Sequence, residues 1–165
     1  MNWFKKIFGK KKDQPKSTQS IPSTSGPMLA PWLDIARAEI GVKEIPGSKH
    51  EKRILEYHKA TSLESTEDEV PWCSSFVSWC LEKAEVPSTR NAWARSYLAW
   101  GTKIDKPVLG CIVVFSRGAS SGHVAFYIDE SDAGIQCLGG NQGNKVCLST
   151  YPKSRVLGYR IPKLK

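Results

Sequence analysis

The sequence predicts an α+β protein, because helical patterning in its first part gives way to strand patterning in its second. Before Pro107 the apolar residues recur every three or four positions, which is the period of a helix with one buried face. After Pro107 they recur at every second position, and Gly, Ser, Asp and Asn separate the short segments. We therefore expect N-terminal helices packed on an antiparallel sheet of about five strands.

The strongest expected helix spans residues 72–85, where Pro71 suits the start and an apolar stripe follows. Weaker helical patterns cover residues 31–42, 50–60 and 93–100. In the first of these, Ile40 is expected on the buried face, and in the second His58 is expected to point inward. The expected strands are residues 111–116, 123–129, 134–138, 145–149 and 156–161.

The positive charge is concentrated near the N-terminus. The chain has a formal net charge of +8, and residues 1–30 contain six lysines against one aspartate, a net +5. Residues 1–12 place Trp3, Phe4, Ile7 and Phe8 opposite lysines at helical spacing, which suits an interfacial helix on an anionic membrane or wall surface. A disordered solubilising tail is the alternative. Residues 13–27 have the composition of a flexible linker, so we expect the folded domain to span residues 28–165.

Several classes of protein are disfavoured by the composition. The main domain has no basic stripe for nucleic acid, and no run of about 18 apolar residues predicts a membrane span. No signal-peptide pattern follows the first lysines, so we expect synthesis in the cytoplasm. The five cysteines and three histidines lack metal-ligand spacing, and neither a metal nor an organic cofactor is expected. We expect a monomer.

Cys73 is the first candidate for chemistry, because it lies in the first turn of the strongest helix. Unpaired N–H groups and the positive end of the helix dipole favour a thiolate there, and the thiolate is the nucleophilic form. The alternative is a buried core cysteine, since Cys73 has core spacing to Phe76 and Val77.

His123 and Asn141 complete the candidate site. His123 begins a strand in which Val124, Phe126 and Ile128 are expected to face the core, so its imidazole is expected on the accessible face, titrating near neutrality. Asn141 follows two glycines just after the next strand, close enough to hydrogen-bond the imidazole and orient it. A solvated histidine and an ordinary Gly/Asn turn are the alternatives.

The order Cys, His, Asn is that of papain-like enzymes. The segments that carry a closer resemblance are 71–81 (PWCSSFVSWCL), 94–96 (ARS), 122–127 (GHVAFY) and 139–142 (GGNQ). They resemble the CHAP-type cell-wall amidases and peptidases of the NlpC-like superfamily, in particular the single-domain proteins of bacteria and phages. The resemblance runs from about Pro31 to Pro162. Two departures are Gly139, where many relatives have an acidic residue, and Cys111, where relatives usually have aspartate.

The resemblance implies a papain-like fold and a peptidoglycan hydrolase, either an amidase or an endopeptidase. Such an enzyme would act on the cell wall or in the periplasm after its release or delivery. Cys73 matches the family's nucleophile, His123 its base and Asn141 an orienting polar position. Trp72, Trp93 and Tyr127 are candidates for lining a substrate groove, although aromatic residues are more often part of a core. Two alternatives remain: a non-catalytic peptidoglycan-binding or virion structural module, and a protein acyltransferase or deamidase on the same fold.

Overall fold

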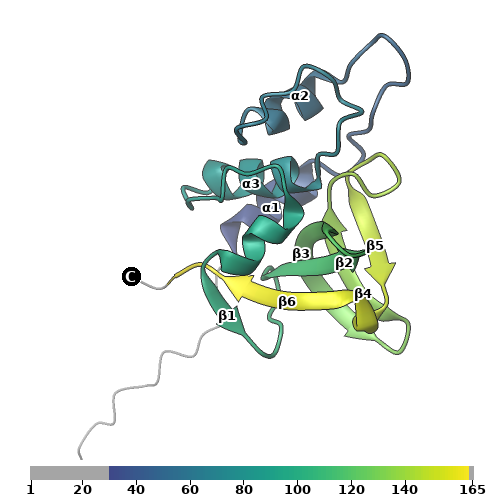
Figure 1. Ribbon diagram of the computed structural model, residues 1–165. Helices are drawn as coiled ribbons and strands as arrows, with labels where there is room; N and C mark the ends of the chain where they lie inside the picture. The colour runs from purple at the N-terminus through teal and green to yellow at the C-terminus, as the bar shows by residue number, and fades with distance from the viewer. Residues whose placement is uncertain (1–29, 164–165) are drawn as a thin grey trace, which may run out of the picture.

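The computed structural model describes residues 30–163, and in it three α-helices and a short 3-10 helix precede most of the sheet (Figure 1). The α+β prediction is confirmed, because the helices cover one side of an antiparallel sheet. The predicted tail and linker, residues 1–27, lie outside the described residues. No helix within residues 30–163 is long and apolar enough to cross a membrane. The helical elements before the sheet are α1 (Pro31–Ala38), α2 (Lys52–His58), α3 (Cys73–Lys83) and η1 (Ala94–Ala99).

The sheet has six strands in the order β1-β6-β2-β3-β4-β5, one more than the sequence predicts. The additional strand, β1, has only three residues and pairs with β6 at the edge of the sheet. Its first two residues are exposed, so no alternating pattern marks it in the sequence. A second 3-10 helix, η2, spans Lys153–Arg155. The strands are β1 (Thr102–Ile104), β2 (Ile112–Arg117), β3 (Ser121–Ser131), β4 (Gly134–Gly139), β5 (Cys147–Tyr151) and β6 (Val156–Ile161).

The first helix is shorter than predicted. It ends at Ala38, so Ile40 lies beyond the helix and is 50% exposed, whereas we expected it on the buried face. Glu39 is the buried residue at this end, because the Tyr57 hydroxyl donates a hydrogen bond to its carboxylate. Paired in this way, the carboxylate can be accommodated inside the protein.

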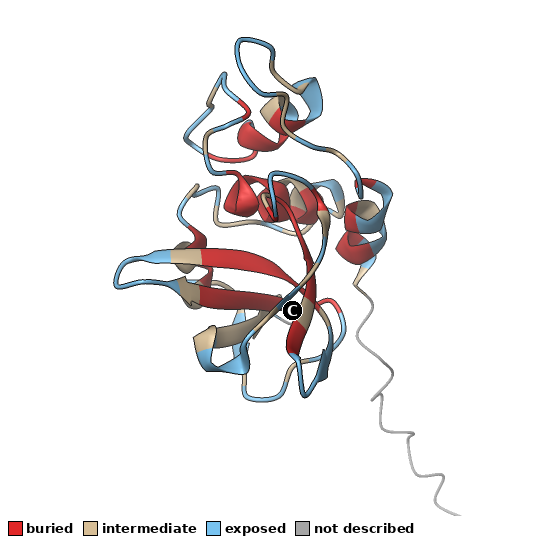
Figure 2. Cartoon of the chain, turned by 90° about the vertical axis from the view of Figure 1, so that its right-hand side faces the viewer, coloured by how far each residue is buried: buried red, intermediate tan, exposed pale blue. Residues whose placement is uncertain are grey.

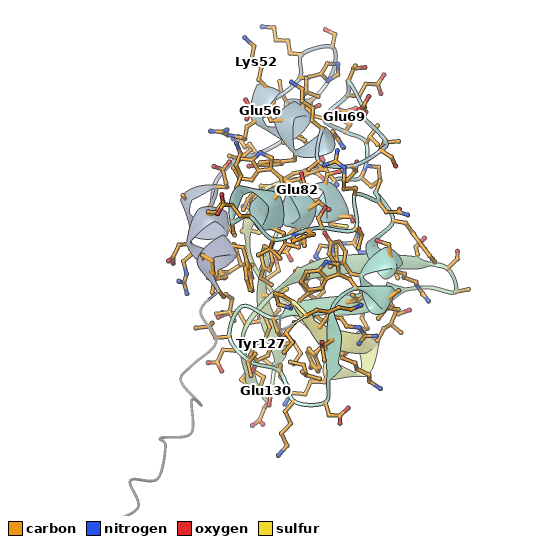
Figure 3. The ribbon with its side chains drawn as sticks, turned by 90° about the vertical axis from the view of Figure 1, so that its left-hand side faces the viewer. Lys52, Glu56, Glu69, Glu82, Tyr127 and Glu130 are labelled. Atoms are coloured by element: carbon orange, nitrogen blue, oxygen red, sulfur yellow. The ribbon has the colours of Figure 1, made fainter. Side chains whose placement is uncertain are left out.

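Helix α3 lies at the centre of the helical layer, between α2 and the sheet (Figure 1). Its residues Phe76, Val77, Cys80 and Leu81 are fully buried, as their helical spacing predicts. Figure 2 shows buried residues along α3 and along the inner parts of the strands. Figure 3 shows Lys52 and Glu56 on the side of the helical layer away from the sheet, and Tyr127 and Glu130 at the opposite end of the molecule.

Both faces of the central strands are buried, which differs from our expectation of one core face. Val124 and Phe126 pack in the cluster beneath the helices. Ala125 and Tyr127, on the other face of β3, pack in a second cluster with Phe115 of β2. The chain after β4 supplies the cover for this second face, since Tyr151, Val156 and Tyr159 pack against it. Residues of β3 that alternate away from the helices are therefore also inside the protein.

Candidate active site

Cys73 is the first residue of α3, and its side chain reaches the start of β3. No side chain caps this end of the helix, so the first N–H groups remain available for a ligand. Burial raises the pKa of the Cys73 thiol, because only 7% of the residue is exposed. The backbone N–H of Val124, the Arg117 guanidinium and the N–H groups of the helix start oppose this increase in pKa. The thiol therefore lies close to the backbone of the residue after His123.

His123 is fully buried, which corrects the expectation of an accessible histidine. Its ring stacks on Phe115, its direct partner across the β2–β3 pair, and contacts Tyr151 of β5, with ring centroids 5.2 Å apart. Tyr151 comes from 28 positions further along the chain, so the pattern within β3 could not reveal this cover. Burial lowers the pKa of His123 to about 4, and the imidazole is neutral near pH 7.

The hydrogen bond that we expected from Asn141 is made instead by Gln142, the next residue. His123 Nε2 lies 2.9 Å from Gln142 Oε1. The Gln142 amide is fixed at its other end, where Nε2 donates to the carbonyl oxygen of Cys147 at 2.6 Å. Asn141 has a φ of +54°, so it forms the left-handed corner of the turn. The chain changes direction at Asn141, and the longer side chain of Gln142 reaches the imidazole.

Two glycines make room for this arrangement. A Cβ atom at Gly139 would lie 2.8 Å from Gln142 Oε1 and 2.9 Å from the Cβ of Ala125. A Cβ atom at Gly140 would lie 2.6 Å from the Trp72 ring and 2.7 Å from the Cβ of Phe76. Gly140 thus lets the β4–β5 turn pack against the start of α3. Gly139, where many of the resembling sequences carry an acidic residue, leaves the space that the Gln142 amide occupies.

The hydrogen bonds define the protonation of the imidazole. Because Gln142 Nε2 donates to a carbonyl, its Oε1 is the atom that faces His123, and His123 Nε2 must carry the hydrogen. His123 Nδ1 then holds a lone pair, and this buried atom has no hydrogen-bond partner among the described residues. A buried polar atom without a partner costs on the order of 1–3 kcal/mol, and within residues 30–163 the one other such side-chain atom is His58 Nε2.

Of the three aromatic residues considered as substrate contacts, only Trp93 is at the surface. Trp93 is 54% exposed, and its indole N–H donates to the carbonyl oxygen of Ser120 in the β2–β3 turn. Trp72 is instead fully buried and donates to Glu44 Oε1 at 2.8 Å. Tyr127 is also buried and packs edge-on against Tyr159, on the second face of the sheet. Trp72 and Tyr127 therefore belong to the core.

Two arginines that the sequence analysis did not single out are close to the imidazole. The positive charges of Arg117 and Arg155 both disfavour protonation of His123 and add to the effect of burial in lowering its pKa. Arg117 ends β2, and Arg155 immediately precedes β6. Finding them in advance would require the pairing of β2 with both β3 and β6, which no local pattern specifies.

Comparison with known proteins concerns the family and the fold. Residues 65–141, which include the starts of α3 and β3 and reach the β4–β5 turn, match the CHAP domain family. This part of the chain is similar to a CHAP domain. This is a family of cysteine- and histidine-dependent hydrolases related to peptidoglycan. The family resemblance predicted from the sequence is thereby confirmed.

A solved structure has a similar fold. It is described as similar to a lipoprotein of the NLP/P60 family from Staphylococcus aureus, and it superposes with a TM-score of 0.53 at 16% identity. The superposition covers 86% of this chain but 45% of the other, so the present chain spans less than half of that protein. At this identity the likeness concerns the fold alone, which fits the predicted papain-like class. No curated protein matches the chain.

Proposed function

We propose that this protein hydrolyses an amide bond of peptidoglycan, with Cys73 as nucleophile, His123 as base and Gln142 as the residue that orients His123. The observation that carries the proposal is the state of His123. One ring nitrogen is held by Gln142, while the other is buried without a partner among the described residues, and the backbone N–H of the next residue, Val124, approaches the Cys73 thiol. A general base needs this division, with one nitrogen fixed and the other free to accept a proton.

The resting pair is neutral in this proposal. Burial raises the pKa of Cys73 and lowers that of His123 to about 4, so thiol and imidazole coexist near pH 7. The proton moves from Cys73 Sγ to His123 Nδ1 as the sulfur attacks the substrate carbonyl carbon. Gln142 Oε1 continues to accept from Nε2–H and stabilises the imidazolium that forms.

The remaining steps complete an acyl transfer. Backbone N–H groups at the uncapped start of α3 hold the oxyanion of the tetrahedral intermediate. The C–N bond breaks, and His123 Nδ1 gives its proton to the leaving amine. Water, deprotonated by the same nitrogen, then attacks the thioester. A carboxylic acid is released, and the Cys73 thiol is restored.

One observation favours a second candidate, a peptidoglycan-binding module without turnover. His123 has no exposed surface, and Cys73 is only 7% exposed, so substrate must displace part of the cover before it reaches the sulfur. The two candidates predict different outcomes when purified cell walls are incubated with the full chain. Hydrolysis releases new amino groups and new muropeptides, whereas a binding module pellets with intact walls.

The test compares the wild-type chain with Cys73→Ala and Cys147→Ala on the same walls, with products identified by mass spectrometry. We expect wild type and Cys147→Ala to release the same muropeptides and Cys73→Ala to release none. Circular dichroism establishes that each variant is folded. Wall binding without release by the wild type would support the binding module, and release by Cys73→Ala would exclude Cys73 as nucleophile.

A further inference from the structure

The β2–β3 pairing places Arg117 beside His123. Phe115 pairs directly with His123, and Arg117 follows two positions along β2, so its side chain leaves the sheet on the same face. Diagonal neighbours on one face of an antiparallel pair are about 7–8 Å apart, within reach of a long side chain. Arg117 is exposed, at the outer end of the strand. Its guanidinium is near enough to the imidazole for its positive charge to disfavour protonation of His123.

Arg155 reaches the same place from the other side of β2. Its Nε donates to the carbonyl oxygen of Ser116 at 3.0 Å, which fixes the start of the guanidinium. Its central carbon lies 5.3 Å from the centroid of the Tyr151 ring, and Tyr151 is the ring that covers His123. The two guanidiniums thus approach the His123 ring from the end of β2 and from the end of η2.

Neither guanidinium forms an ion pair with a carboxylate within residues 30–163. The arginines that do are on the helical side of the protein: Arg37 pairs with Asp34, Arg53 with Glu39 and Glu56, and Arg90 with Glu82. A third arginine near the hairpin is already engaged, since Arg95 donates to the carbonyl oxygens of Ser121 and Gly118.

Two cations that approach the same site repel each other, and an anion bound between them would offset this repulsion. Guanidiniums bind carboxylates through parallel N–H donors, a geometry that one arginine or a pair can supply. We propose that Arg117 and Arg155 form a carboxylate-binding subsite that selects substrates with a free carboxylate next to the scissile amide. This inference rests on the proposed function, because it concerns the substrate of that same site.

The test uses two soluble stem-peptide substrates that differ only in one group, a free carboxylate or its carboxamide next to the scissile bond. For the wild type we expect kcat/KM to be about tenfold or more higher on the carboxylate, as is typical of a charge-assisted contact. Arg117→Gln and Arg155→Gln should each remove most of this preference, measured as the ratio of kcat/KM on the two substrates within the same variant. Arg37→Gln, an exposed arginine on α1, is the matched control and should retain the preference.

Charge reversal separates a subsite from a general electrostatic effect. Arg117→Glu should invert the preference, so that the carboxamide becomes the better substrate. If the arginine variants lost activity equally on both substrates, and 0.5 M salt removed the difference between the variants and the wild type, the arginines would only attract anionic walls. This result would overturn the proposal. Equal wild-type rates on both substrates would overturn it too while leaving the proposed hydrolase intact. If the wild type cleaved neither of the two soluble substrates nor purified walls, the proposed function itself would be contradicted.

Discussion

Acidification should destabilise this protein through His123, and the structure gives the size of the effect. Burial lowers the pKa of His123 from 6.5 to about 4 in the folded chain. Between these pH values the unfolded chain binds a proton that the folded chain does not, so stability falls as pH falls. At about 1.4 kcal/mol per tenfold difference in proton affinity, this one histidine removes roughly 3 kcal/mol of stability between pH 6.5 and 4.

The measurement is urea unfolding of the wild type and His123→Asn at several pH values from 4.5 to 7.5, with the free energy of unfolding extrapolated to water. The wild-type free energy should fall more steeply with acid than that of the variant. The difference should approach about 1.4 kcal/mol for each pH unit in the middle of the interval. His58, also buried with a lowered pKa, contributes in the same direction in both proteins and cancels. Parallel curves for the two proteins would show that His123 is not buried as a neutral group.

Three further predictions test other parts of the account. Gly139→Ala should reduce turnover by about tenfold or more, because the added methyl group displaces the Gln142 amide. Gly158→Ala is the control and should have little effect on turnover, because its methyl group meets only the ends of flexible side chains. Alkylation of Cys73 by iodoacetamide should accelerate steadily from pH 6 to 9, because the pKa of this thiol is raised; a fast rate already constant at pH 5 would instead reveal a preformed thiolate. Deleting residues 1–27 should leave cleavage of soluble muropeptides unchanged but weaken binding to anionic vesicles, since each lysine near such a surface contributes about 1 kcal/mol at low salt. Loss of turnover on the soluble substrate would instead place the tail within the folded domain.

Local sequence patterns were sufficient for the main features of the fold. The change of period after Pro107 predicted helices followed by an antiparallel sheet, and the 72–85 pattern predicted the helix that begins at Cys73. His58 is buried, as its helical position predicts, with Nδ1 3.1 Å from Ser75 Oγ. These features depend on residues within a few positions of one another, which a sequence displays directly.

The details of the site depend on contacts between distant segments. The cover over His123 comes from Tyr151, and the second face of the sheet is closed by residues after β4. The choice between Asn141 and Gln142 depends on a left-handed residue in the turn, and a shift of one position changes which side chain faces inward. Arg117 and Arg155 are both near His123 only because β2 pairs with both β3 and β6. No periodic pattern specifies such pairings.

The central claim is an acyl-enzyme on Cys73, and partition between two acceptors tests it directly. Purified walls are digested in the presence of increasing hydroxylamine, which competes with water for a thioester, and the products are analysed by mass spectrometry. The account predicts that the newly formed ends include hydroxamates, in a proportion that rises with hydroxylamine, and that Cys73→Ala gives neither hydroxamate nor carboxylate ends. Cleavage by the wild type that yields only carboxylates at every concentration, or cleavage that persists in Cys73→Ala, would contradict it.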